Sequence, residues 1–391
     1  MIMAIDNKDK VLNVPNLRFP EFTEEWVLHR TTDYFEFKNG LNPEAKRFGH
    51  GTKFISVMDI LNNRYITYDK VISSVQLKEN ELNEFGVNYG DILFQRSSET
   101  LEDVGRANVY LDNTTAVFGG FVIRGKKIGN YNPLFFRYLL SSPNARKSII
   151  VKGAGAQHFN ISQDGLSKVL LNVPSIQEQE KISQLINYID ERIETQIKII
   201  EDLKKLKVAI RDKQLNAIRK HYGLNYQICD LFDYEQPTKY VVTDTEYSED
   251  ISKTPVLTAN KAFILGYTNE TFGIYDKGKC IILDDFTLDC KYVDFPFKVK
   301  SSAIKILTVK NGYSLRYVYE YLNYLNLETT EHKRHYISEI EPMMIAYPTD
   351  KKKIDDFNNM MSSLESKIEI ENKYLQSLLV QKSYLLSNMF I

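Results

Sequence analysis

The chain of 391 residues is poor in cysteine and tryptophan and has no excess of either charge. Its three cysteines, Cys229, Cys280 and Cys290, are odd in number, and none of them lies in a C-x-x-C pair. We therefore expect reduced, structural thiols, and no zinc site because His and Cys do not cluster at ligand spacing. The formal net charge of −1 excludes a globally basic, histone-like binder but leaves room for a local basic surface.

Long apolar runs are also missing from the sequence. No stretch approaches the roughly 20 apolar residues that a bilayer-spanning helix needs, and the start MIMAIDNKDK lacks the pattern of a signal peptide. We expect a cytoplasmic protein with no membrane contact. With 43% hydrophobic and 26% charged residues it has an ordinary globular composition, and its length predicts two domains.

Motifs that would carry catalysis are absent or incomplete. The sequence has no glycine-rich turn for S-adenosylmethionine and no G-x-x-x-x-G-K-[ST] loop for ATP. NPLF at 132–135 is similar to the N/D-P-P-Y/F loop of amino-group DNA methyltransferases, but it lacks the second proline and begins a helix. Asp285, Asp289 and Lys291 loosely resemble a nuclease cluster, although a solvated turn between strands is the favoured interpretation. We expect no catalytic residue, no metal site and no cofactor on this chain.

Two long helical patterns dominate what the sequence does contain, at about 176–215 and 350–390. Neither contains Gly or Pro, and the apolar residues of each step by three and four, which predicts one stripe per helix. A shift of 175 positions superimposes the two stripes. It places Ile182, Ile186, Ile189 and Ile193 on Phe357, Met361, Leu364 and Ile368. Because a single-stripe helix cannot bury its apolar face alone, we predict that the two pair as an antiparallel coiled coil.

Charges on the first long helix are divided along its length. Acidic residues gather in the first half and basic residues in the second, an order that the helix dipole favours. The favoured interpretation of the basic half is a solvated helix end. The acidic residues are Glu178, Glu180, Asp190, Glu191 and Glu194, and the basic ones are Lys204, Lys205, Lys207, Arg211 and Lys213.

Two globular segments precede the two helices and repeat one order of elements. The first is expected to have strands at 54–60, 90–94 and 116–123, a helix at 134–139 and a strand ending in Pro174. The second repeats this order with strands at 254–259, 280–284 and 304–309. We predict an α+β fold with two similar domains alternating with two long helices in a pseudo-two-fold arrangement. The expected segments are 1–174, 175–222, 223–348 and 349–391.

Two stretches of the first domain have residue types suited to reading DNA. Arg and Gln beside a strand end can make bidentate contacts to guanine and adenine edges, and the alternative there is a plain surface loop. In KGAGAQHFN the glycines let the backbone approach a phosphate, and the alternative is a connector. The candidates are Gln95, Arg96, Ser97 and Arg106 in the first stretch and Lys152, Gln157, His158 and Asn160 in the second.

The second domain offers matching candidates. Lys333, Arg334 and His335 form a compact basic trio at the position that corresponds to the second stretch. Thr258, Asn260 and Lys261 lie at a strand end in LTANKAF. We expect the lysines and the arginine to engage phosphates and the Asn and Thr side chains to read bases.

Four motifs resemble the specificity subunit of type I restriction–modification systems, and the resemblance covers essentially the whole chain, with two target recognition domains alternating with two helical spacers. They are NLRFPEFTEEW at 16–26, NVPSIQEQEKI at 172–182, EQPTKY at 235–240 and TPVLTANKAFILGYTNE at 254–270. The second helix departs from the pattern, because YPTDKKKIDDF has lysines in place of the Glu-Gln pair.

The resemblance implies a non-catalytic DNA-binding subunit that serves host defence. Each target recognition domain would read one half of a bipartite, asymmetric site in double-stranded DNA, while the helices set the spacing and dock methyltransferase subunits. S-adenosylmethionine, ATP and Mg would be bound by those subunits and by the restriction and translocase subunits.

Two other functions remain open at this point. One is a self-sufficient DNA methyltransferase or nuclease, which would methylate or cut DNA unaided. The other is a coiled-coil adaptor without DNA binding, whose retention on DNA would ignore both sequence and salt.

Overall fold

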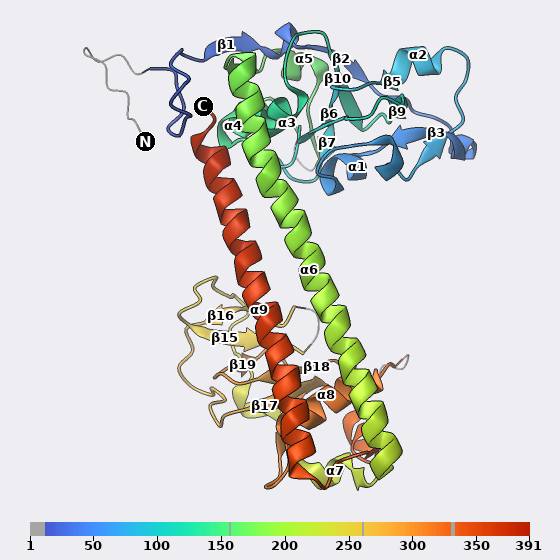
Figure 1. Cartoon of the computed structure of the whole chain (residues 1–391), viewed down its shortest axis with the longest axis vertical. Helices are drawn as coiled ribbons and strands as arrows, with labels where there is room; N and C mark the ends of the chain where they lie inside the picture. The colour runs from blue at the N-terminus through green and yellow to red at the C-terminus, as the bar shows by residue number, and fades with distance from the viewer. Residues whose placement is uncertain (1–11, 156–157, 260–261, 330–332) are drawn as a thin grey trace. The chain divides into compact units, whose positions relative to one another are not determined.

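The computed structural model describes residues 12–155, 158–259, 262–329 and 333–391 and divides into two compact units (Figure 1). Unit 1 holds the described residues up to Ile197 together with Lys373–Ile391, and unit 2 holds Lys198–Asn372. The long helices α6 (Ile176–Tyr222) and α9 (Lys351–Asn388) each contribute one part to each unit. The four segments expected from the sequence follow helix ends instead, and their boundaries remain a prediction.

In unit 1 the first part of α6 packs against the last part of α9. In Figure 1 the red end of α9 lies beside the green start of α6. Lys382 Nζ lies 2.6 Å from an Asp190 carboxylate oxygen, and Arg192 donates a hydrogen bond to the Tyr374 hydroxyl, so the two segments run antiparallel. The shared core contains Ile182, Ile186, Ile189 and Ile193 of α6 and Leu378 and Leu385 of α9.

In unit 2 the remaining parts of the same helices pack in the same way. Lys353 lies over the Tyr222 ring, 5.2 Å from its centroid, and Lys207 lies 3.5 Å from Glu365, so this pairing is also antiparallel. The buried apolar residues of the pair are Leu215 and Ile218 on α6 and Ile354, Phe357 and Met361 on α9. The α+β class, expected from the order of strands and helices, is confirmed. The antiparallel pairing of the helices, expected from the duplicated stripe, is confirmed within each unit.

The first module consists of β1 to β12 and the segment that precedes them. It is built around a four-stranded antiparallel sheet of order β2-β10-β6-β8, with a second sheet of order β4-β3-β9-β5. Its strands are β1 (Val27–Arg30), β2 (Phe35–Asn39), β3 (Phe48–Ile55), β4 (Ser74–Val75), β5 (Gly86–Val87), β6 (Ile92–Gln95), β7 (Ser97–Ser98), β8 (Ala107–Val109), β9 (Ala116–Phe118), β10 (Val122–Lys127), β11 (Phe159–Asn160) and β12 (Leu170–Val173). Its helices are α1 (Val57–Asn62), α2 (Glu81–Phe85), α3 (Pro133–Ser141), α4 (Pro143–Ile150) and α5 (Gln163–Ser167).

The second module consists of β13 to β21 and repeats this topology. The sheet β14-β20-β17-β18 corresponds to β2-β10-β6-β8, and β15 pairs in parallel with β19 as β3 does with β9. Its strands are β13 (Tyr226–Gln227), β14 (Phe232–Glu235), β15 (Thr254–Leu257), β16 (Ile264–Thr268), β17 (Cys280–Asp284), β18 (Cys290–Val293), β19 (Lys298–Val299), β20 (Ile304–Val309) and β21 (Met344–Ile345). Its helices are α7 (Ile228–Leu231), α8 (Leu315–Leu325) and a π-helical turn at Tyr336–Ile340.

Two of the expected strands were wrong in extent. The stretch 54–60 is the end of β3 followed by α1, because Ser56 caps α1 in a capping box with Asp59. The stretch 116–123 is two strands, β9 and β10, that a turn at Gly119 and Gly120 separates. In both stretches the apolar pattern continues past the end of the strand, so the sequence alone does not reveal where the strand ends.

NPLF at 132–135 begins a helix, as expected. The Asn132 side chain accepts a hydrogen bond of 2.9 Å from the Phe135 amide, and Pro133 is the first residue of α3. Phe135 contacts Trp26 and Phe390 at centroid distances of 6.0 and 5.5 Å. Asn132 is therefore a helix cap beside an aromatic core.

Candidate nucleic-acid interface

A pocket of about 480 Å³ in the first module brings together three residues that the sequence predicts to bind DNA. Arg96 comes from the β6–β7 connection, Lys152 from the segment after α4, and Asn160 from β11. Together they offer a guanidinium, an ammonium and an amide at one opening. The pocket is lined by Asn39, Arg96, Lys152, Ala154, Asn160, Ile161, Ser162, Gln163 and Asp164.

Strand pairing explains why these residues meet. The short strands β7 and β11 are antiparallel with Ser97 opposite Asn160, and the Ser97 hydroxyl donates to the Asn160 side chain. The Ile161 amide donates to the Arg96 carbonyl at 2.9 Å, which continues the same pairing. The guanidinium of Arg96 donates to the Gly120 carbonyl at 3.2 Å. Backbone bonds thus set the separation of the two reading stretches.

In the glycine-rich stretch, Gly155 allows the backbone to pass close to another part of the same loop. Ala154 and Asn160 exchange two backbone hydrogen bonds of 3.0 and 2.8 Å, which closes a loop. Gly155 has φ +144°, and a Cβ there would lie 2.0 Å from the His158 carbonyl oxygen. The close approach at Gly155 is therefore to the chain's own backbone, whereas the sequence predicted an approach to phosphate.

The other candidates of the first module differ in exposure. Gln95 is 6% exposed and donates to the Ser97 carbonyl at 2.9 Å, so its side chain faces the interior. Arg106 is exposed and lies 2.8 Å from Asp103. His158 is exposed, and Gln157 lies outside the described residues.

In the second module the predicted residues differ in exposure. Thr258 is buried, and its amide donates to the Phe263 carbonyl at 3.0 Å. Lys333 lies 3.0 Å from Glu339, and Arg334 is exposed. Asn260 and Lys261 lie outside the described residues.

His335 lies in the interior of the second module, with 2% of its surface exposed. Its ring nitrogens face Glu339 and Thr329, each at 2.9 Å, and its amide donates to Asp285. Hydrogen bonds from His335 and then from Lys333 lower the pKa of Glu339. This histidine has no ring edge left for a base, so it joins two segments of the module.

The nuclease-like cluster has a structural role as well. Asp285 is 1% exposed, lies 3.4 Å from the buried Lys305, and accepts from the Tyr336 amide at 2.7 Å. Among residues 12–155, 158–259, 262–329 and 333–391, no three His, Cys, Asp or Glu side chains are placed to hold a metal ion. Burial raises the pKa of Cys280 and of Cys290 to about 12, so neither thiol is a ready nucleophile at neutral pH.

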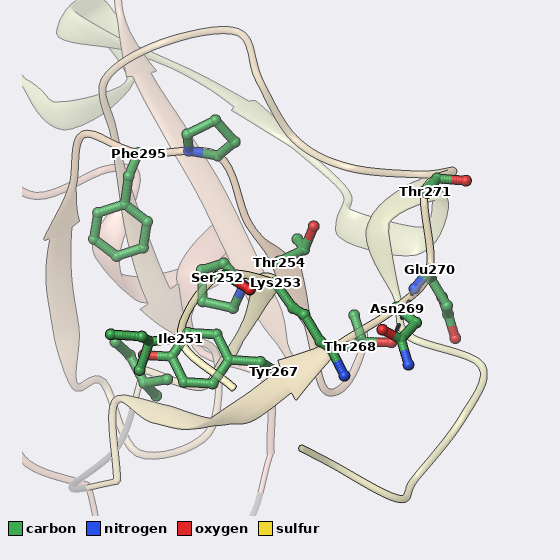
Figure 2. A pocket seen from close by; sticks show the side chains of 13 residues that line it. Ile251, Ser252, Lys253, Thr254, Tyr267, Thr268, Asn269, Glu270, Thr271 and Phe295 are labelled. Carbon is green, nitrogen blue, oxygen red and sulfur yellow. Dashed lines mark hydrogen bonds between the residues drawn. The ribbon is translucent and has the colours of Figure 1, made fainter. Parts of the chain in front are cut away.

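A pocket of about 630 Å³ in the second module contains no residue that the sequence analysis selected. Figure 2 shows side chains of β16 and the turn after it, with Phe295 contributed by the segment between β18 and β19. Only folding gathers these segments, although 254–270 carries one of the family-like motifs. The lining residues are Ile251, Ser252, Lys253, Thr254, Pro255, Ile264, Tyr267, Thr268, Asn269, Glu270, Thr271, Phe295 and Pro296.

Glu270, at the edge of this pocket, holds its loop through an ion pair. Its carboxylate lies 2.7 Å from Lys298 Nζ, accepts from the Thr243 hydroxyl at 2.6 Å, and accepts from the Asp244 amide at 3.0 Å. Burial by itself raises the pKa of Glu270, but the hydrogen bonds from Lys298 and Thr243 outweigh it and lower the pKa to about 2. Lys298 is fully buried and also donates to the Phe272 carbonyl at 2.7 Å.

We predict that Lys298→Met lowers the free energy of unfolding by up to about 3 kcal/mol at neutral pH, since it leaves Glu270 without its cation. The folded-state pKa of Glu270 lies below its ordinary value of 4.5, so this stabilisation is present above pH 4.5 and is lost as the pH falls towards 2. Urea unfolding at several pH values should show that the difference in free energy of unfolding between parent and variant shrinks as the pH falls from 4.5 towards 2. The exposed Lys300→Met is the control, and a difference independent of pH would contradict the assignment.

No helix within the described parts of the chain has the length and apolarity that crossing a bilayer requires. The same two-module topology occurs in solved structures. The S subunit of a type I restriction–modification system from M. genitalium matches with a TM-score of 0.58 at 16% identity over 97% of this chain and 99% of that one. A chain from a structure on complex assembly and conformational transition of the type I R-M system matches with a TM-score of 0.56 at 10% identity, covering 92% and 96%. These matches establish a shared fold.

Sequence comparisons give a more specific relationship. Residues 23–205 match the model of the type I restriction modification DNA specificity domain. The EcoR124I/EcoR124II specificity subunit of Escherichia coli is 53% identical over 121 residues, and the EcoKI specificity subunit of E. coli K12 is 28% identical over 170 residues. These matches cover 29% and 41% of this chain and only 30% and 36% of the two relatives.

Fold and sequence together define a two-module protein with paired helices and a DNA specificity domain in its first half. The resemblance seen in the motifs is confirmed for residues 23–205, which match the DNA specificity domain of type I restriction–modification systems.

Proposed function

We propose that this chain is the sequence-specific DNA recognition subunit of a type I restriction–modification complex. The observation that carries the proposal is the specificity domain at residues 23–205 together with a second module of the same topology. One domain per half-site accounts for the duplication, and divergent surfaces account for an asymmetric site. Figure 1 labels some of the strands that repeat, among them β3 and β9 in the first module and β15 and β19 in the second.

In the first module, the pocket around Arg96 is the proposed reading surface. A guanidinium can donate two hydrogen bonds to a guanine edge, and Asn160 can pair with an adenine edge. Lys152 is exposed and carries a charge suited to a phosphate. In the second module Lys333 and Arg334 of the predicted trio are both exposed, and Arg334 takes the phosphate role because Lys333 is paired with Glu339.

The long helices are proposed to set the spacing between half-sites and to dock methyltransferase subunits. Restriction and translocase subunits would complete the complex, and S-adenosylmethionine, ATP and Mg would be held by those partners. The chain would then have no activity of its own. This division of labour agrees with a sequence that contains neither an S-adenosylmethionine motif nor a phosphate loop.

Two alternatives make different predictions. A self-sufficient methyltransferase or nuclease would act on DNA without partners, and the structural roles of Asn132 and Asp285 argue against the two motifs that suggested it. An adaptor without DNA binding would need neither a specificity domain nor its topological repeat. Both alternatives are therefore less well supported than the recognition subunit.

Exchange of the first module for that of a relative should change one half of the methylated DNA motif and leave the other half intact. The physical reason is that each module has its own sheets and its own core. The measurement is methylation-sensitive sequencing of a host that carries methyltransferase subunits with either the parent or the exchanged chain. The matched control exchanges the second module, which should change the opposite half.

Simultaneous change of both halves would contradict independent reading. Methylation that continues in a host without this gene would refute the recognition role itself.

A further inference from the structure

The contacts that seat the two modules on α6 have opposite charge polarity in the two units. The sequence already divides α6 into an acidic first half and a basic second half. In each unit a module presents the complementary charge, and the pairs are largely buried, so the division has a role beyond solvation of a helix end.

In unit 1 the acid is on the helix and the cations are on the module. Asp190 of α6 is 5% exposed and accepts from the Tyr138 hydroxyl at 2.8 Å. Arg64 and Arg137 of the first module place their guanidinium nitrogens 3.9 and 3.8 Å from it. Lys382 of α9 completes the cluster at 2.6 Å. Three cations thus depend on one buried carboxylate.

Two further contacts of unit 1 have the same polarity. Arg18, which precedes β1, makes two hydrogen bonds of 2.8 Å with Glu178 at the start of α6, and Glu178 is 1% exposed. Arg64 also reaches Glu191 at 3.4 Å and Glu194 at 3.2 Å. The acidic first half of α6 therefore meets arginines from two parts of the chain.

In unit 2 the polarity is reversed. Lys207 of α6 lies 2.9 Å from Glu320 of α8, which is 1% exposed. The same lysine lies 3.5 Å from Glu365 of α9, and Arg316 of α8 pairs with both glutamates. Here the helix supplies the cation and the module supplies the buried carboxylate.

Because these ion pairs are buried, a module that presents the wrong charge to α6 would be strongly destabilised. A surface ion pair contributes little, but a charge buried without its partner destabilises strongly. A module with an arginine in place of Glu320 would put that cation against Lys207. A module with acids in place of Arg64 and Arg137 would put them against Asp190.

We propose that α6 selects its modules by charge, so that each module fits only its own half of the helix. The acidic half accepts a module whose contact surface presents arginines, and the basic half accepts one that presents a carboxylate. Asp190 and Lys207 are then positioning residues for DNA reading, which rests on the proposed function. The rule also states which related modules can be exchanged into each position.

The test is a charge-exchange cycle in the full-length chain. The parent of the cycle carries Arg316→Gln and Glu365→Gln, because these two charges contact the pair and would oppose its reversal. The variants are Lys207→Glu, Glu320→Lys and the double variant. Amide hydrogen exchange of α8 and β20 should accelerate at least tenfold in each single variant. In the double variant it should return to within about threefold of the parent, because the pair is restored with reversed sign. Lys204→Glu, an exposed position on the same helix, should leave exchange unchanged.

A second measurement uses methyltransferase partners and DNA with altered half-site spacing. Each single variant should lose at least tenfold of its preference for the parent spacing, and the double variant should recover it. Lys207→Met removes the charge without reversing it and should give a smaller loss in both measurements. A double variant as impaired as the two singles combined would overturn the charge rule. If the double variant recovers amide protection, the charge rule is upheld. If the parent chain with its partners shows no preference among DNA sequences, the proposed function is refuted whatever the outcome for the charge rule.

Discussion

Replacement of Ile186 by Asp is expected to reduce the free energy of unfolding by about 5 kcal/mol or more. Ile186 is fully buried in the core that α6 shares with α9 and the first module. The substitution removes a large apolar side chain and places a carboxylate in the apolar core, and the two costs add. Circular dichroism during urea unfolding should show a lower midpoint. Hydrogen-exchange measurements should show accelerated amide exchange in both helix segments of unit 1.

The matched control is Ile197→Asp on the same helix, where the side chain is 41% exposed. It should change the free energy of unfolding by less than about 1 kcal/mol, because its carboxylate stays hydrated. Equal effects at the two positions would show that the helix pair does not hold unit 1 together.

Replacement of Arg96 by Ala should relax one base position of the first half-site. The expected loss of discrimination is about 1–3 kcal/mol, or roughly 5- to 150-fold between the preferred base and its competitors. Arg96 is held by the Gly120 carbonyl in a pocket that also presents Asn160, so the loss should fall on a single position and spare the second half-site. Binding to a base-substituted panel of duplexes, with methyltransferase subunits present, measures it.

Two variants distinguish reading from phosphate attraction. Lys152→Ala should weaken binding to every duplex alike and reduce the salt dependence by about one counterion. Arg30→Ala is the matched control for Arg96, since Arg30 is an exposed arginine of the first module that does not line the pocket. If Arg96→Ala and Arg30→Ala behave alike on the whole panel, the reading surface lies elsewhere in the first module.

The candidate site was predictable from residue type only in part. Arg96, Lys152 and Asn160 stand out by residue type in two turn-rich stretches of the sequence, and folding brings them to one pocket. His335 has the same sequence signature as Arg334, yet its ring is buried between Glu339 and Thr329. The local backbone conformation decides which side chain of a polar cluster points outward. Residue composition does not predict that direction.

Tertiary contacts also decided what local motifs mean. Gly155 permits a close approach, but the partner is the His158 carbonyl of the same loop. The acidic residues near 285 loosely resembled a nuclease cluster, and a solvated turn was the favoured interpretation. That interpretation was wrong for Asp285, which is buried and pairs with Lys305 of β20. Lys305 belongs to β20, a strand other than the one that Asp285 follows, so a short window of the sequence does not contain both of them.

The sequence by itself determined the α+β class, the internal duplication, the two long helices and their antiparallel pairing. These features follow from apolar periodicity and from the need to bury a stripe, which act over each turn of a helix and over each strand. Only the tertiary structure decided which polar residues reach the surface, how the strands end and which charges meet on α6. Those outcomes depend on desolvation and on partners from other segments, such as Arg64 with Asp190 and Lys207 with Glu320.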